Sequence, residues 1–281
     1  MNQRLRIGLI GAGGIVKSRH LPNLVRLAEV ELVAVSNRRP ESAEAIAREW
    51  GVGRIETDWR AVVAADDIDA VLIGTPPVLH KEIAIAALEA GKHVFCQARM
   101  ARTYAEATAM LAAERRAALR GQKAQLCLAP DGLAVDAVMR QLLYEEQVLG
   151  RLLGGVVTAA SGAYLDPAVP VHWRQSWAVS GYNTLSLGII VEVVHRWLGE
   201  FRRVSALTAT HTAHRPAPNG EGLLPVERPD LVAISALHNS GAAFSLHFSG
   251  VSRGAKGGIE LHGTDASLRF YWGESVVWIN R

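Results

Sequence analysis

The segment Gly8-Leu9-Ile10-Gly11-Ala12-Gly13-Gly14-Ile15 carries the strongest chemical signal in the chain. Gly11 would permit a tight turn after an apolar run, and Gly13 would let the backbone approach a pyrophosphate at the start of a helix. Val16 stands where such a pattern usually has a third glycine or alanine, which loosens the match. A plain glycine turn is the alternative. The placement between a strand and a helix favours a dinucleotide site at Gly11, Gly13, Gly14 and Ile15.

The end of the next apolar run indicates which nicotinamide nucleotide would fit. A site that prefers NAD places Asp or Glu there, to bind the ribose 2′-hydroxyl. This chain has Ser36-Asn37-Arg38-Arg39, and its nearest acid, Glu31, lies at the other end of the run. Arg38 or Arg39 could hold a 2′-phosphate through charge-assisted hydrogen bonds. With Asn37 they predict a site that favours NADP(H) over NAD(H); the alternative is a pair of solvent-facing arginines.

The elements that must position these residues alternate through the first half of the chain. Short apolar runs separated by helix-like segments indicate a parallel sheet with right-handed crossovers. The expected strands are Arg6–Ile10, Val30–Ser36, Ala70–Gly74, Val94–Gln97 and Gln125–Leu128. The expected helices are Ile15–Leu27, Glu41–Trp50, His80–Ala90 and Tyr104–Arg120.

The second half has a different pattern, with strands that follow one another and little helix between them. This favours an open, mostly antiparallel sheet. The expected strands are Gly155–Ala160, Val204–His211, Leu231–His238, Ala243–Phe248, Ile259–His262 and Ser267–Tyr271, with helices at Leu133–Glu146 and Ser186–Leu198, a hairpin at Asn239–Gly241 and a surface loop at His211–Glu227. We therefore predict an α/β protein: a doubly wound Rossmann domain over residues 1–130, then an α+β substrate-binding and oligomerisation domain over residues 131–281.

Composition excludes several classes of protein. The hydrophobic fraction of 49% and the charged fraction of 20% are typical of a globular chain with a large core. The net charge is only +3, and the densest basic clusters, Arg115-Arg116 and Arg202-Arg203, are short, so no nucleic-acid partner is expected. The sequence shows no membrane-length apolar run, no signal-peptide pattern and no metal-ligand spacing. Cys96 and Cys127 form no disulfide framework, which fits a cytoplasmic protein.

Several segments of the sequence resemble those of a known protein family. The chain resembles the Gfo/Idh/MocA oxidoreductases over nearly all its length, through the segments RIGLIGAGGI, DAVLIGTPPVLH and ALEAGKHVFCQARMA and the order of its two domains. The resemblance implies that Thr75, Pro76 and His80 flank the nicotinamide side of a cleft, and that Gln97 stands where the family has Glu. It also implies oxidation or reduction of a carbinol or carbonyl on a sugar, a cyclic polyol or a related small molecule.

The same resemblance exposes three missing groups. The family's Glu-Lys-Pro is Gln97-Ala98-Arg99 here, and its Asp-x-Gly-x-His corresponds to Ser186-Leu187-Gly188-Ile189-Ile190. Hydride transfer from an alcohol needs a base for the hydroxyl proton, and the usual lysine, acid and imidazole are gone. The chain is therefore similar to an atypical branch of the family.

Three side chains are candidates for the missing chemistry: Arg99, His172 and Tyr182. Arg99 could polarise a carbonyl or hold an anionic substrate. His172 and Tyr182 precede the Ser186–Leu198 helix, where family substrates bind; an exposed loop histidine is the alternative for His172. Two functions stay open. One is an NAD(P)-dependent oxidoreductase with an unusual acid–base group; the other is a catalytically impaired member that binds nucleotide or sugar as a sensor, scaffold or partner subunit.

The second-half strands also carry apolar residues in both registers. Val232, Ile234 and Ala236 share one face of their strand, while Leu231, Ala233 and Leu237 share the other. One face would pack on the Ser186–Leu198 helix and the other would stay open, which is typical of an interface. We expect a homodimer or homotetramer formed through this sheet. A covering loop at His211–Glu227 is the alternative.

Overall fold

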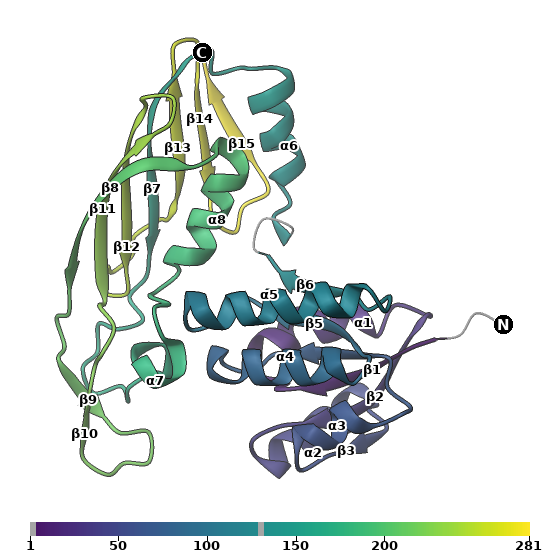
Figure 1. The fold of residues 1–281 in the computed structure, drawn as a ribbon. Helices are drawn as coiled ribbons and strands as arrows, with labels where there is room; N and C mark the ends of the chain where they lie inside the picture. Colours follow the sequence, from purple (N-terminus) through teal and green to yellow (C-terminus); the bar gives the residue numbers. More distant parts are fainter. Residues whose placement is uncertain (1–3, 129–131) are drawn as a thin grey trace. The chain divides into compact units, whose positions relative to one another are not determined.

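The computed structural model describes residues 4–128 and 132–281. The chain forms two compact units (Figure 1): unit 1 comprises Met1–Cys127 with Ala178–Tyr182, and unit 2 comprises Leu128–Trp177 with Asn183–Arg281. The expected boundary between residues 130 and 131 lies outside the described residues. No sequence pattern predicts the return of Ala178–Tyr182 to unit 1.

Unit 1 is built on a six-stranded parallel sheet in the order β3-β2-β1-β4-β5-β6. Its strands are β1 (Leu5–Ile10), β2 (Val30–Ser36), β3 (Arg54–Ile55), β4 (Ala70–Ile73), β5 (His93–Gln97) and β6 (Ala124–Cys127). Helices pack on both faces, so the central strands are almost wholly buried and apolar. This order is the doubly wound arrangement, in which the strand order reverses between β1 and β4 while all strands stay parallel. The predicted Rossmann fold is confirmed.

The connections of unit 1 are η1 (Val16–His20), α1 (Leu21–Leu24), α2 (Pro40–Trp50), α3 (Trp59–Ala64), η2 (Pro77–Leu79), α4 (His80–Glu89) and α5 (Tyr104–Ala118). The helix expected over Ile15–Leu27 begins as the π-helical turn η1 and ends at Leu24. The end caps follow sequence chemistry: Gly51 closes α2 in the left-handed region, and the Thr103 side chain accepts from the N–H of Glu106 at the start of α5.

Unit 2 contains a seven-stranded sheet in the order β15-β14-β13-β7-β12-β11-β8. Its strands are β7 (Leu152–Ala160), β8 (Phe201–Ala209), β11 (Leu231–His238), β12 (Ala243–Ser249), β13 (Gly258–Gly263), β14 (Ser267–Tyr271) and β15 (Val277–Asn280). The pair β7 and β12 is parallel and the other neighbours are antiparallel, which confirms the predicted mostly antiparallel sheet. The remaining elements are α6 (Asp136–Arg140), η4 (Gln141–Glu145), η5 (Trp173–Gln175), α7 (Trp177–Ser180), α8 (Leu187–Leu198), β9 (His214–Pro216) and β10 (Leu223–Pro225).

Two expectations for unit 2 need correction. The segment His211–Glu227 is not a plain loop, because β9 and β10 pair within it as an antiparallel ribbon. Buried Arg215 anchors this ribbon by donating to the carbonyls of Tyr164, Asp166 and Val169. The Pro and Gly residues of the segment are typical of irregular chain, but Pro216 and Pro225 stand at strand ends, where a two-stranded ribbon tolerates them.

The two faces of the unit 2 sheet differ more than the pattern predicts. One face, which includes Leu246, Phe248 and Ile259, is buried under α6, η4 and α8. The opposite face pairs Ser205, Ser235 and Ser245 across three strands, and it carries the Glu260–Arg269 ion pair. Apolar residues remain there, among them Val156, Leu207 and Trp278. The second face is thus mixed rather than uniformly apolar.

Among the described residues, no helix is long and apolar enough to cross a membrane.

Phe248→Ala should lower the stability of unit 2 by about 3–5 kcal/mol, because it leaves a cavity in the core under the helices. Phe248 is 0% exposed, whereas Leu207 on the other face is 77% exposed. Leu207→Ala is the matched control and should change stability by no more than about 0.5 kcal/mol. Urea denaturation followed by circular dichroism measures both. Equal losses would show that the assignment of the two faces is wrong.

Candidate active site

The candidate site of unit 1 lies at the carboxyl edge of the parallel sheet, where the loops after β1, β2, β4 and β5 meet. Gly11 has φ +82°, and a Cβ there would lie 2.6 Å from the Thr75 backbone nitrogen. Only glycine meets both demands. Gly13 and Gly14 differ, because both are exposed and a Cβ on either would have no protein atom within 4 Å. The open backbone at these two glycines fits the close approach of a phosphate group.

The residues after β2 divide into a positioning residue and two exposed cations. Asn37 Oδ1 accepts from the Ala12 N–H at 2.7 Å, and Asn37 Nδ2 donates to Ser42 Oγ at 3.0 Å. Asn37 therefore ties the glycine loop to α2. Arg38 and Arg39 are exposed and form no ion pair with any other residue in the described part of the chain. They are available to an anionic group at this edge.

Thr75 and His80 join the turn after β4 to the loop after β5. His80 is 1% exposed, with Nε2 2.7 Å from the Thr75 carbonyl oxygen and Nδ1 2.9 Å from that of Arg99. Burial lowers the pKa of His80, and the hydrogen bonds to these carbonyls, which act to raise the pKa, offset this only in part. The ring thus braces two loops and does not face solvent. Thr75 Oγ1 is buried with no hydrogen-bond partner among the described residues, so this hydroxyl is suited to a bound cofactor.

A histidine that no sequence motif indicated, His20, lies beside Gln97. His20, at the end of η1, places Nε2 2.6 Å from Gln97 Oε1, and its ring packs edge-on against Phe95. This contact links the helix after β1 to the end of β5. The signal available in the sequence was weak, since a single histidine in an amphipathic segment is usually a surface residue. His20 therefore contacts Gln97, one of the candidate cofactor-binding residues.

Tyr182 reaches the same edge from far along the chain. Its backbone N–H donates to the carbonyl of Arg102 at 2.9 Å, and Arg102 lies between the end of β5 and the start of α5. The Tyr182 side chain is 71% exposed. Of the three catalytic candidates, Arg99 and Tyr182 belong to unit 1, together with the glycine loop, and His172 belongs to unit 2.

Comparisons with known proteins identify the family of this chain. Residues 5–123 match the Gfo/Idh/MocA description, an oxidoreductase family with an NAD-binding Rossmann fold. Levoglucosan dehydrogenase of Pseudarthrobacter phenanthrenivorans is 31% identical over 95% of this chain and 74% of its own. Inositol 2-dehydrogenase 4 of Saccharopolyspora erythraea is 30% identical over 98% of this chain and 80% of its own. A solved levoglucosan dehydrogenase in complex with NADH and L-sorbose superposes with a TM-score of 0.86 at 29% identity, covering 98% of this chain and 76% of that one.

The chain belongs to the Gfo/Idh/MocA family. The resemblance inferred from the sequence is thereby confirmed, as is an NAD(P) cofactor for the Rossmann unit. The distant relatives of this family member act on sugars and polyols by their names.

The unit 2 candidate of this family member, His172, serves as a helix cap. Its Nδ1 accepts from the Arg174 N–H at 3.2 Å, and its own N–H donates to Gln175 Oε1 at 3.0 Å. Burial and the charge of Arg174 lower the pKa of His172. The ring is therefore neutral near pH 7, with its proton on Nε2, so it offers a donor there and not a lone pair. The indoles of Trp173 and Trp177 each have a guanidinium over them, from Arg174 and Arg228.

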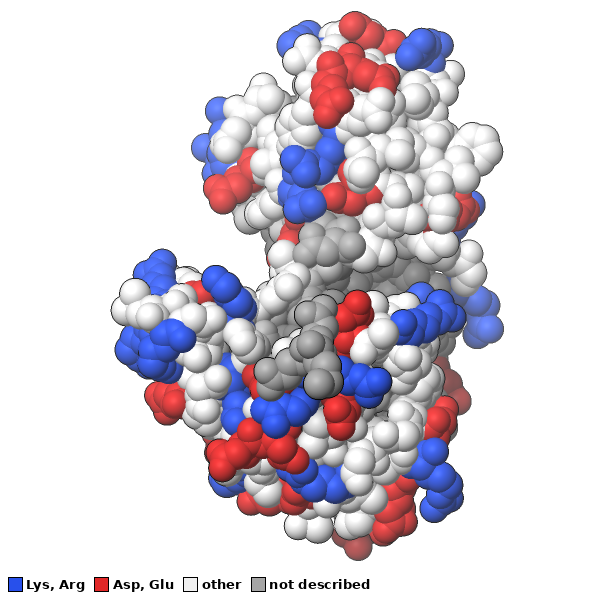
Figure 2. All heavy atoms as spheres, turned by 90° about the vertical axis from the view of Figure 1, so that its right-hand side faces the viewer, with Lys and Arg blue, Asp and Glu red and all other residues white. Residues whose placement is uncertain are grey.

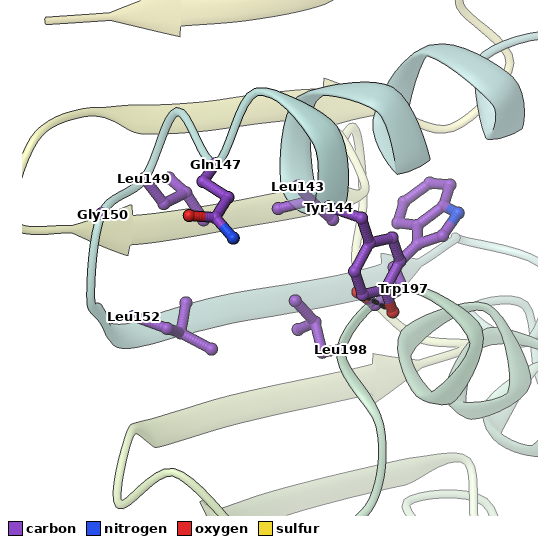
Figure 3. A pocket seen from close by; sticks show the side chains of 8 residues that line it. All are labelled: Leu143, Tyr144, Gln147, Leu149, Gly150, Leu152, Trp197 and Leu198. Carbon is purple, nitrogen blue, oxygen red and sulfur yellow. Dashed lines mark hydrogen bonds between the residues drawn. The ribbon is translucent and has the colours of Figure 1, made fainter.

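Unit 2 also contains a pocket of about 310 Å³ (Figure 3), which holds none of the predicted site residues. Much of its lining comes from four leucines, Leu143, Leu149, Leu152 and Leu198, and the Tyr144 hydroxyl donates to the Trp197 carbonyl at 3.0 Å.

On the face drawn in Figure 2, Lys and Arg are interspersed with Asp and Glu. No group of His, Cys, Asp and Glu within residues 4–128 and 132–281 could hold a metal ion.

Gly13→Ala tests the open glycine loop. Gly13 lies outside the left-handed region and its Cβ direction is free, so thermal stability should stay within about 2 °C of the parent. The added methyl would occupy the space needed by a pyrophosphate, and the Kd for a nicotinamide nucleotide should rise at least about tenfold. Calorimetric titration measures this change. Undiminished binding would place the cofactor elsewhere; Gly11→Ala, which should also destabilise unit 1, is the comparison.

Proposed function

We propose that this chain is an NADP(H)-dependent oxidoreductase that acts on a CH–OH or carbonyl group of a sugar, a cyclic polyol or a related small molecule. The observation that carries the proposal is the carboxyl edge of unit 1. There the open backbone of Gly13 and Gly14 shares an edge with exposed Arg38 and Arg39. The relatives named above supply the substrate class.

The cofactor preference rests on what stands at the end of β2. Residues 36–39 contain no carboxylate that could accept from a ribose 2′-hydroxyl, and the Asn37 amide is already bonded to Ala12 and Ser42. Arg38 and Arg39 offer planar donor forks that match a 2′-phosphate. The charge at this position therefore favours NADP(H).

Replacing both arginines tests the preference. In the Arg38→Ala, Arg39→Ala double variant the Kd for NADPH should rise at least about tenfold, because a pair of charge-assisted contacts is lost. The Kd for NADH should change less than about threefold, since that nucleotide has no 2′-phosphate. Fluorescence titration of both nucleotides gives the comparison. A parent protein that binds NADH more tightly than NADPH would refute the role of the arginines.

We propose a proton-transfer role for Tyr182 and a substrate-holding role for Arg99, both of which belong to unit 1. A bound nicotinamide supplies or accepts the hydride. Tyr182 would give its hydroxyl proton to a carbonyl oxygen during reduction, or take one from an alcohol through the reverse step. His80 contacts the Arg99 backbone carbonyl after β5, and the Arg99 guanidinium would bind a carbonyl or an anionic group of the substrate. In unit 2, His172 has Nδ1 engaged as a cap, which leaves Nε2 as its candidate hydrogen-bond donor.

A catalytically impaired member is the second candidate function. Ala98, Ser186 and Ile190 stand where the family resemblance puts lysine, acid and imidazole. Ser186 precedes α8, and Ile190 packs against the core of unit 2. On these replacements we propose that the chain belongs to an atypical branch of the family. If no other group handles the proton, cofactor binding would serve a sensor, scaffold or partner-subunit role.

A turnover screen distinguishes the two functions. Sugars, inositols and keto-sugars are supplied with NADPH or NADP, and nicotinamide absorbance is followed. We expect turnover with at least one compound, and a loss of about 10²–10⁴ in kcat for Tyr182→Phe, the range of general acid–base catalysis. His172→Asn keeps a capping side chain and should lose far less. Tight cofactor binding without turnover across the panel would support the impaired member.

We also propose a homodimer or homotetramer formed through the open face of the unit 2 sheet. Leu207 and Trp278 are exposed on this face beside the paired serines and the Glu260–Arg269 pair. Leu207→Glu should weaken the assembly without unfolding the chain, because the side chain lies outside the core. Light scattering after size exclusion gives the mass; a 30.3 kDa monomer at micromolar concentration would refute the assembly.

A further inference from the structure

The segment Ala178–Tyr182 returns to unit 1 and is held there by one residue. Arg102 Nη1 donates to the Ala178 carbonyl at 2.8 Å, while the Arg102 carbonyl accepts from the Tyr182 N–H at 2.9 Å. The two hydrogen bonds hold the segment at its first residue, Ala178, and at its last residue, Tyr182. We call Arg102, Glu106 and the segment Ala178–Tyr182 the Arg102 clamp.

Glu106 fixes the side chain that makes this grip. It is buried in the first turn of α5 and accepts from Arg102 Nε at 3.0 Å, from Arg102 Nη2 at 2.5 Å and from the Arg102 N–H at 2.9 Å. Burial acts to raise the pKa of Glu106, but the hydrogen bonds and charge of Arg102 outweigh it and hold the pKa below its usual value. The carboxylate therefore stays charged at neutral pH. With Nε and Nη2 engaged, the guanidinium directs Nη1 at Ala178.

Gly181 lets the segment come close enough to be held. It is buried at φ +60°, and a Cβ there would lie 2.3 Å from the Arg102 carbonyl oxygen and 2.5 Å from Arg102 Cβ. No other residue type fits both the conformation and the contact. The glycine thus brings the next residue, Tyr182, against the loop after β5.

We propose that Arg102 is the positioning residue for Tyr182, and that the clamp sets where the tyrosine ring stands at the carboxyl edge of unit 1. The inference rests on the proposed role of Tyr182 in proton transfer. Arg102 touches neither the substrate nor the reacting atoms; it acts by fixing the backbone on both sides of Gly181. The Tyr182 N–H is bonded to the Arg102 carbonyl, so the clamp fixes the backbone from which the tyrosine ring projects.

The first test is independent of turnover. Hydrogen–deuterium exchange of peptides that span residues 178–183 is measured in the full chain. Arg102→Lys can keep a charge pair with Glu106 but lacks the fork that also reaches Ala178, and Gly181→Ala forces the segment away. Both should raise the exchange rate of the segment at least tenfold. Arg116→Met, on exposed α5 surface, and Gly51→Ala, with positive φ but open space, should leave the rate within twofold. An unchanged rate in both clamp variants would overturn the clamp.

The second test is a double-mutant cycle on kcat, with the KM for substrate measured in parallel. Arg102→Lys should lower kcat at least tenfold when Tyr182 is present and less than twofold in the Tyr182→Phe background, while the Kd for NADPH stays within twofold. Equal losses in both backgrounds would overturn the positioning role, because Arg102 would then act independently of Tyr182. Full activity of Tyr182→Phe would instead refute the proposed proton transfer, and the exchange rates would still decide whether the clamp exists.

Discussion

The site of unit 1 depends on how closely the turns after β1 and β4 approach each other. Gly11 lies against Thr75, and a Cβ on Gly74 would lie 2.5 Å from the Gly11 carbonyl oxygen. From this contact a series of hydrogen bonds runs along the carboxyl edge. Asn37 holds the glycine loop on one side, and His80 passes from the turn after β4 to the carbonyls after β5 on the other. Each loop is fixed by a neighbour that the parallel sheet places beside it.

How much could be predicted from the sequence depends on the range of the interactions involved. The strands at Arg6–Ile10 and Val30–Ser36 and the turn at Gly11 were predictable, because apolar runs and glycine conformations are local properties. Strand β3 was missed, since two residues cannot show a period. The contacts of His20 with Gln97 and of Arg102 with Ala178 join residues 77 and 76 positions apart. Nothing in local composition specifies such pairs.

The arginines of this chain illustrate why residue type alone does not reveal a role. Arg6 and Arg54 are paired with carboxylates on the surface, Arg102 with a buried one, and Arg215 is buried among backbone carbonyls. Arg38 and Arg39 differ by having no such partner among the described side chains. A guanidinium donates hydrogen bonds to the acceptors around it, so the role of an arginine depends on which acceptors lie nearby. Only the structure separates the arginines that support the fold from those left for a ligand.

The parallel pair inside the antiparallel sheet of unit 2 has a consequence for biosynthesis. Strand β7 is the first strand of that sheet to leave the ribosome, yet in the folded sheet it lies between two later strands. Its Gly154 pairs with Ala243 of β12 on one side and with His262 of β13 on the other. Both of its edges must therefore wait, unpaired, while most of the remaining chain is translated. Non-local pairing of this kind folds slowly and leaves strand edges open to aggregation. Helix α8 is complete before either partner strand emerges. It can therefore pack on the apolar face of β7 and keep that face from other chains during translation.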